Sequence, residues 1–209
     1  MRTAPYTRLA GVYDAIMGDV DYDDWVTFLV DEATHRGYAG GPILDLACGT
    51  GNATRPAVAR GYDVEGLDVA PAMLAVARAR LPGVTFHEGD ATALALPRRY
   101  ALIYSVFDAL NNLLDDDAFL AMARGVHAHL APGGVFAFDA NTRAGLRDLW
   151  GGRAEGWAGD VYYRWTHRYD ADADLAEATV PEVTKHVNEE HGLEAEHIAC
   201  IGPAGENQV

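Results

Sequence analysis

The chain has 209 residues, of which 49% are hydrophobic and 22% are charged, as is typical of a globular protein with one domain, or one domain and an appendage. Its formal net charge of -15 argues against nucleic acid or an anionic membrane as a partner, because both require basic patches. No apolar stretch approaches the ~20 residues of a membrane span. The N-terminus lacks the apolar core of a signal peptide, and two cysteines suit a reducing compartment, so we expect a cytoplasmic protein.

The first 36 residues are expected to form an N-terminal arm and a cap helix. Tyrosines recur in residues 1–22, and this arm either packs its aromatic rings on the domain or forms a lid over a pocket. An amphipathic helix is predicted over residues 22–36, with Asp23 and Asp24 favourably placed at its start.

Residues 37–142 alternate between strand and helix patterns, which predicts right-handed crossovers and a doubly wound, mainly parallel sheet with helices on both faces. Short apolar runs predict five strands, at residues 43–47, 62–67, 84–87, 100–106 and 135–139. Helices are predicted between them at residues 52–60, 71–80 and 115–130. A turn is expected at residues 131–134, and the acidic triplet at 115–117 is interpreted as a helix cap rather than a metal site.

Residues 143–209 follow a different pattern. A short helix near residues 146–150 is followed by an aromatic, alternating strand at 161–169, an acidic turn, and a returning strand at 175–187 interrupted at Pro181. Residues 189–209 are weakly patterned and are expected to be loosely ordered at their end. The expected fold is therefore a Rossmann-like core with an inserted or C-terminal antiparallel hairpin.

The stretch from Ile43 to Asn52 reads as a buried strand that enters a glycine turn and then a helix. Asp45 interrupts the apolar run, and a buried carboxylate is costly unless it is hydrogen-bonded. Ligands of such sheets bind beyond the carboxyl ends of the strands, near the point where strand order reverses. Gly49 and Gly51 with Asp68 partly match a dinucleotide-binding turn, but Thr54 occupies the third small position.

Five short motifs follow one another along the chain: L-D-L-A-C-G-T-G at 44–51, G-L-D-V-A-P-A-M-L at 66–74, G-D-A at 89–91, S-V-F-D-A-L-N-N-L at 105–113 and L-A-P-G-G at 130–134. Together they resemble the motifs of the class I S-adenosylmethionine-dependent methyltransferases, particularly a bacterial small-molecule-type subgroup. The resemblance implies S-adenosyl-L-methionine as cofactor and methyl transfer to a small-molecule acceptor. It also implies a set of cofactor-binding residues: Asp45, Ala47, Gly49, Gly51, Asp68, Val69, Met73, Asp90, Ala91 and Ser105.

Within this resemblance, Asp68 is expected to accept hydrogen bonds from both ribose hydroxyls. Asp45 is expected to orient the turn and to meet the positively charged part of the cofactor, directly or through water. Asp90 is expected at the adenine edge, although its position also suits a turn or a helix cap. Methyl transfer depends largely on positioning, so a general base is optional and depends on the acceptor. The candidate polar residues near the site are Asp108, Asn111, Asn112, Asn141 and Tyr13, none of which is assigned as a base. Among them, Asn111 is expected to make a polar contact near the methyl group.

Other functions are less consistent with the sequence. The eight histidines form no metal-ligand spacing, so no metal is expected. The residues after the fourth strand lack the Pro-Pro-aromatic pattern of base-modifying methyltransferases. The sixth and seventh strands of the family are not recognisable, which leaves a possible exposed sheet edge and homodimer. The alternatives are a nicotinamide-dependent oxidoreductase and a non-catalytic cofactor-binding or interaction protein with an incomplete fold.

Overall fold

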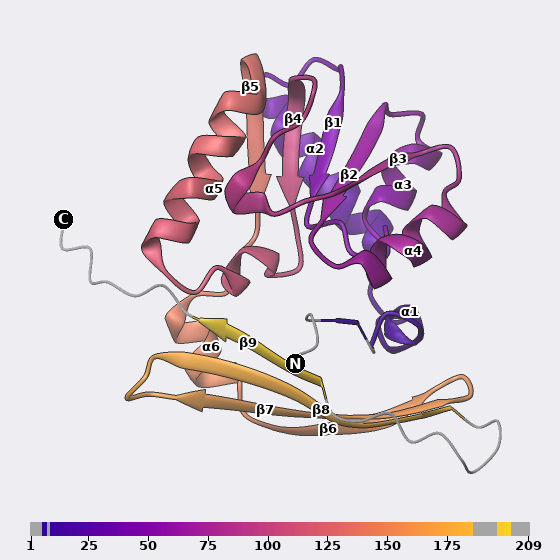
Figure 1. Cartoon of the computed structure of the whole chain (residues 1–209), viewed down its shortest axis with the longest axis vertical. Coiled ribbons are helices and arrows are strands. Elements are labelled where there is room, and N and C mark those ends of the chain that lie inside the picture. Colours follow the sequence, from indigo (N-terminus) through magenta and orange to yellow (C-terminus); the bar gives the residue numbers. More distant parts are fainter. Residues whose placement is uncertain (1–5, 8, 186–195, 202–209) are drawn as a thin grey trace.

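The computed structural model describes residues 6–7, 9–185 and 196–201, and its core is a parallel sheet of five strands in the order β3-β2-β1-β4-β5 (Figure 1). The strands are β1 (Ile43–Leu46), β2 (Val64–Asp68), β3 (Thr85–Glu88), β4 (Tyr100–Ser105) and β5 (Leu130–Phe138). Strand order reverses between β1 and β4, which confirms the predicted doubly wound sheet and puts a ligand crevice at the end of β1.

Helices cover both faces of this sheet because its central strands are apolar on both sides. The helices of the core are α2 (Tyr22–His35), α3 (Thr54–Ala59), α4 (Pro71–Arg80) and α5 (Asp116–His129), with short 3₁₀ turns η1 (Ala91–Ala93) and η2 (Ala109–Asn112). Side chains of α2 and α3 pack with Ile43 and Leu102, whereas Met122 and Val126 of α5 pack with Leu44 on the opposite face. The acidic triplet is a cap as predicted, since the Asp115 carboxylate accepts from the backbone N–H of Ala118.

A second, antiparallel sheet lies beyond the carboxyl ends of the core strands, in the order β6-β7-β8-β9 (Figure 1). Helix α6 (Arg143–Leu149) leads into it, and its strands are β6 (Gly152–Ala158), β7 (Val161–Asp170), β8 (Leu175–Lys185) and β9 (Glu196–Ile201). The predicted antiparallel hairpin is present as β7 and β8, and β6 and β9, which were not predicted, extend it on both sides.

Two sites where the sequence predicts a turn or a break in a strand lie within strands of the structure. The expected turn at 131–134 belongs to β5, where Gly133 adopts φ +77° and the pairing with β4 shifts register between Tyr100 and Leu102. Pro181 lies within β8 beside a register shift, between the pairs Thr179–Thr166 and Glu182–Arg164. A bulge accommodates a residue that has no N–H to donate.

The N-terminal segment is packed between the two sheets (Figure 1). It contains the short helix α1 (Tyr13–Ile16). Leu9 and Val12 pack with Val161 and Val180 of the second sheet, and Ala10 packs with Met73 of α4. The arm therefore joins the two sheets through apolar contacts on both of its sides.

Candidate active site

One cavity, called here the first cavity, has a volume of about 410 Å³ and lies at the carboxyl ends of β1, β2 and β4. This volume falls within the roughly 300–1,000 Å³ typical of small-molecule sites. Among the predicted cofactor-binding residues, the structure brings eight to its wall: Asp45, Ala47, Gly49, Asp68, Val69, Met73, Asp90 and Ala91. Gly51 and Ser105 are not part of that wall.

The glycine turn after β1 needs unusual backbone angles. Ala47, Gly49 and Gly51 have φ values of +63°, +55° and +80°, in the left-handed region that glycine adopts without steric cost. A Cβ atom built on Gly49 would have Met73 Cε, at 4.0 Å, as its nearest neighbour. At Gly51 a Cβ would instead lie 3.3 Å from Leu81 Cδ1, so that glycine serves packing beneath the turn.

Asp68 connects the end of β2 to the glycine turn. One carboxylate oxygen accepts from the backbone N–H of Gly49 at 2.7 Å, and the other accepts from the N–H of Ala70 at 2.8 Å. Burial raises the pKa of Asp68, while its bonds from backbone N–H groups oppose that shift. Each oxygen keeps a further lone pair, so the carboxylate can also accept hydroxyl groups of a ligand in the cavity.

Asp45 is almost completely buried, with 1% of its surface exposed. Its carboxylate accepts a hydrogen bond from Thr54 Oγ1 at 2.6 Å. Burial raises its pKa to about 7; hydrogen bonds from Thr54 and Tyr104 oppose the shift, and the charge of Asp68 adds to it. A cation in the cavity would favour the ionised form of this group.

An ion-pair network fastens the N-terminal arm to the glycine turn. Asp14 of α1 accepts hydrogen bonds from Thr50 Oγ1 at 2.5 Å and from Asn52 Nδ2 at 2.9 Å. Its other oxygen pairs with Arg80 Nη1 at 2.6 Å, and Arg80 also donates to Asn52 Oδ1 at 2.9 Å. This network was not predicted from the sequence, because its only signal there is an acidic residue on the arm, and nothing in the spacing identifies partners 36 to 66 positions away.

The arm also supplies tyrosines to the cavity wall, namely Tyr6, Tyr13 and Tyr22. This geometry favours the lid interpretation of the arm over simple surface packing. Burial is the largest cause that raises the pKa of Tyr13 well above its ordinary value, so its hydroxyl stays protonated.

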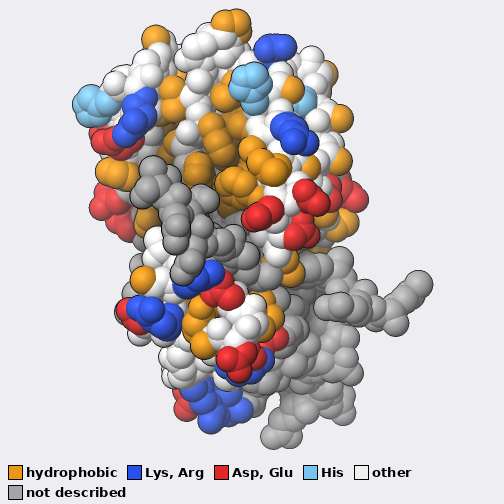
Figure 2. Space-filling model, turned by 90° about the vertical axis from the view of Figure 1, so that its left-hand side faces the viewer, with side chains coloured by type: hydrophobic (Ala, Val, Ile, Leu, Met, Phe, Trp, Pro, Cys, Tyr) orange, Lys and Arg blue, Asp and Glu red, His pale blue; other side chains and the backbone are white. Residues whose placement is uncertain are grey.

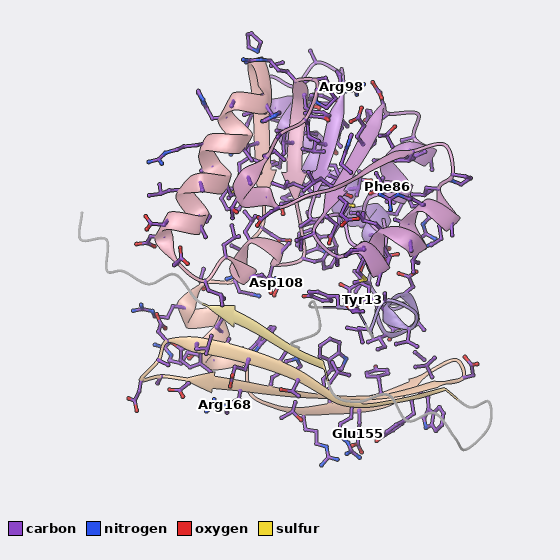
Figure 3. The ribbon with its side chains drawn as sticks, viewed as in Figure 1. Tyr13, Phe86, Arg98, Asp108, Glu155 and Arg168 are labelled. Atoms are coloured by element: carbon purple, nitrogen blue, oxygen red, sulfur yellow. The ribbon has the colours of Figure 1, made fainter. Side chains whose placement is uncertain are left out.

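A second cavity of about 240 Å³ lies between the core and the antiparallel sheet. Tyr6, Tyr13 and Phe107 line both cavities, so the two share a wall. The remaining lining residues of the second cavity are Met17, Asp108, Trp150, Trp165, His167 and Ala178. Figure 3 shows Tyr13 and Asp108 at the boundary between the two sheets, and Glu155 on the outer side of the second sheet.

Asn111 and Ser105 lie near the end of β4 but line neither cavity. Asn111 is buried and exchanges hydrogen bonds with the backbone of Asn141, donating to its carbonyl at 3.0 Å and accepting from its N–H at 2.9 Å. Ser105 is 1% exposed, and its Oγ has no hydrogen-bond partner among the described residues. Asp90 accepts from Thr92 as the cap of η1 and also lines the first cavity, so both of its expected roles are geometrically compatible.

Within the described part of the chain, no group of three or more His, Cys, Asp or Glu side chains is arranged to hold a metal ion. None of the described helices is long and apolar enough to cross a membrane.

Comparison with known proteins gives one consistent family. Residues 43–134 match the model of a methyltransferase domain. A sugar N,N-dimethyltransferase from Streptomyces venezuelae, named for dTDP-3-amino-3,4,6-trideoxy-alpha-D-glucopyranose, is 32% identical over 115 residues, which are 55% of this chain and 48% of that protein. A trans-aconitate 2-methyltransferase from Methylobacterium radiotolerans is 45% identical over 96 residues, 45% of this chain and 35% of that protein. The chain thus spans about half the length or less of these two relatives.

The solved structures extend the similarity across the second sheet. A crystal structure of an S-adenosylmethionine-dependent methyltransferase from Clostridium acetobutylicum superposes with a TM-score of 0.79 at 26% identity, covering 95% of this chain and 82% of that one. DesVI from Streptomyces venezuelae matches in fold with a TM-score of 0.77 at 23% identity, covering 94% and 85%. Motifs, strand order and cavity agree with these matches: residues 43–134 are similar to a methyltransferase domain, and the fold is similar to that of solved S-adenosylmethionine-dependent methyltransferases.

Proposed function

We propose that this protein transfers a methyl group from S-adenosyl-L-methionine to a small-molecule acceptor. The observation that carries the proposal is the pair of adjoining cavities: one formed by the glycine turn and Asp68, the other enclosed by the second sheet and the arm. Two sites with a shared wall suit two reactants that must meet.

The residues of the first cavity fit the cofactor. Gly49 leaves space against Met73, Asp68 offers carboxylate oxygens to ribose hydroxyls, and Asp45 offers negative charge to a cation. We propose that these residues, with Ala47, Val69, Asp90 and Ala91, bind it, that Gly51 shapes the turn, and that Ser105 supports the wall from behind. When bound, the cofactor supplies a methyl group already activated by a sulfonium. The protein then contributes alignment and exclusion of water.

The relatives leave the acceptor open between two chemistries. Some are named as amino-sugar N,N-dimethyltransferases, and others as methyltransferases of trans-aconitate, which carries carboxylates. Both kinds of acceptor are small molecules, one carrying an amine and the other carboxylates. Tyr13, which lines both cavities, is the better-placed of the two proposed polar contacts, and Asn111 is better placed to position the loop after β4.

Calorimetric titration tests the proposal. S-adenosylhomocysteine should bind saturably while NAD gives no heat, and Asp68→Asn should weaken the affinity at least roughly tenfold, since it removes a charged acceptor. Asp63→Asn is the matched control, because Asp63 precedes β2 at its opposite end and pairs with Arg98. Binding of NAD would favour the oxidoreductase alternative, and binding of neither ligand would refute the proposal. Cofactor binding without turnover of any small amine, alcohol or carboxylate would favour the non-catalytic alternative.

Assembly, location and domain limits are also proposals. We divide the chain at residues 36/37 and 142/143, and we propose a cytoplasmic protein without nucleic-acid partners, supported by its net charge of -15. A homodimer is supported by β5, which pairs only with β4 among the described strands and exposes 48% of Phe138. Figure 2 shows apolar side chains gathered on the upper part of this side of the molecule. A monomer mass that is independent of concentration in light scattering would exclude the dimer.

A further inference from the structure

The wall of the second cavity has a distinctive composition. Apart from Met17 and Ala178, its lining is aromatic with one carboxylate, since Tyr6, Tyr13, Phe107, Trp150, Trp165 and His167 surround Asp108. The His167 ring stacks on Trp165 with centroids 5.9 Å apart and meets the edge of Trp150 at 4.8 Å. Burial lowers the pKa of His167, so its imidazole is neutral at neutral pH. Asp108 is therefore the single charged side chain among the described residues that line this cavity.

The Asp108 carboxylate is held in place by an unusual backbone. Phe107 and Asp108 have φ values of +59° and +47°, a conformation that costs non-glycine residues free energy and persists only where the surroundings enforce it. Asp139 enforces it here: its two carboxylate oxygens accept from the N–H groups of Phe107 at 2.8 Å and of Asp108 at 2.7 Å. The loop after β4 thus directs one carboxylate into an aromatic cavity.

The chemistry of this wall selects among acceptors. The faces of aromatic rings carry partial negative charge and attract cations. A lone carboxylate in such surroundings attracts an ammonium group and repels a carboxylate, and no lining side chain of the described residues offers a compensating positive charge. Resting on the proposed function, we propose that the second cavity binds an amine as the methyl acceptor, with the Asp108 carboxylate receiving its N–H, and that it excludes carboxylate acceptors.

An acceptor amine arrives as an ammonium ion at neutral pH and has no free lone pair. One proton must leave before a new N–C bond can form, and the Asp108 carboxylate is placed to take it, so the electron pair stays on nitrogen and Asp108 becomes neutral. With the cofactor bound, this pair would form the N–C bond as the methyl–sulfur bond breaks, and the electrons of that bond would stay on sulfur. Burial, and then the nearby charge of Asp139, raise the pKa of Asp108 to about 6, while a hydrogen bond from Asn141 opposes the shift. A carboxyl group of this pKa is mostly ionised at pH 7 and is still a better proton acceptor than an exposed aspartate.

The wall that the two cavities share orients the amine nitrogen toward the first cavity. Asp108 lines only the second cavity, whereas Tyr13 and Phe107 next to it line both. A nitrogen held at Asp108 therefore lies on the side of the second cavity that adjoins the first.

The test uses three probes of similar size: benzylamine, benzyl alcohol and benzoate. Each is titrated into the protein saturated with S-adenosylhomocysteine, and binding is read from tryptophan fluorescence, because Trp150 and Trp165 line the cavity. Benzylamine should bind more tightly than the other two probes by roughly tenfold to a hundredfold, the range for a hydrogen bond to a charged group. Asp108→Asn should abolish this preference, and asparagine tolerates the left-handed backbone at that position. Asp117→Asn is the matched control, because it removes an exposed carboxylate from the first turn of α5.

Three outcomes would overturn the proposal. They are an affinity for benzoate or benzyl alcohol that equals the affinity for benzylamine, an unchanged preference for benzylamine in Asp108→Asn, and no saturable binding of benzylamine. Calorimetry of S-adenosylhomocysteine on the same variants separates this proposal from the proposed function. If both proteins bind S-adenosylhomocysteine normally but the wild type shows no preference for benzylamine, or Asp108→Asn keeps it, then only the amine assignment fails and the proposed function stands.

Discussion

Replacing Asp14 with alanine tests whether the N-terminal arm covers the cofactor. The substitution removes the acceptor of two hydrogen bonds from Thr50 and Asn52 and the partner of Arg80. The side chains of Asp14 and Arg80 are 32% and 28% exposed, so water replaces part of what is lost. Hydrogen bonds contribute about 1 kcal/mol each, and more when charged, so after discounting for solvent we expect the docked arm to lose about 2 kcal/mol.

If cofactor binding requires the docked arm, the affinity for S-adenosylhomocysteine falls with the fraction of molecules whose arm is docked, by up to about 30-fold in Kd. Calorimetric titration measures that change, and urea unfolding of the unliganded variant shows whether the core remains intact. Asp23→Ala is the control: it breaks a similar ion pair, 2.6 Å from Arg60, that joins α2 to the end of α3 and touches neither cavity. An affinity of Asp14→Ala within about twofold of the control would refute the idea that the arm is a lid.

Two further predictions concern residues of the adjacent strands β1 and β2. Burial raises the pKa of Asp45 from 3.8 to about 7, so the folded protein retains a proton that the unfolded chain releases, and the stability contributed by this group is full below about pH 4 and is lost as pH rises through 7. Asp45→Asn has no such ionisable group and escapes this loss. In urea unfolding, the free energy of unfolding of the variant minus that of the wild type should therefore increase between about pH 5 and pH 8. A difference that stays constant over this range would contradict the argument. Gly66→Ala would place a Cβ 2.6 Å from the Phe86 ring and 2.8 Å from Cys48 Sγ, and should cost about 1–3 kcal/mol by urea unfolding. Phe86→Leu in the same chain should restore part of that loss, whereas an unchanged midpoint in Gly66→Ala would show that the packing is not tight.

The core could be predicted from the sequence because its determinants are local. The parallel strands are apolar runs, and α4 begins at Pro71 and ends at Arg80 as expected. Asp68 follows such a strand, and the parallel topology alone directs strand ends toward one crevice. The predicted wall of the first cavity follows from these two facts.

The second sheet could not be predicted as fully, because its outer strands depend on their neighbours. β6 contains Gly152, Arg153, Glu155 and Gly156, and it shows no alternation of apolar and polar residues. It is a strand because its backbone pairs with β7 from Gly152 to Ala158. Such pairing depends on context more than on propensity.

The loop after β4 illustrates the same limit within the site. Its sequence places Asp108 near the crevice, but the carboxylate that fixes its backbone comes from Asp139, about 30 positions later in the chain. Left-handed backbone at Phe107 and Asp108 is uncommon for these residue types, and the sequence around them carries no glycine that would suggest it. Only the tertiary structure brings the two segments together.

The shared wall between the cavities has a consequence for how this fold can change its chemistry. Residues of the glycine turn and β2 belong to the first cavity alone, whereas Trp150, Trp165 and His167 belong to the second alone. On the proposed function, substitutions in the antiparallel sheet would change the acceptor while the cofactor-binding residues of the first cavity stay constant. Tyr6, Tyr13 and Phe107 line both cavities, so a substitution at any of them alters both cavities at once. A library directed at β7 and β8 is the economical route to a new acceptor, with these three aromatic residues held fixed.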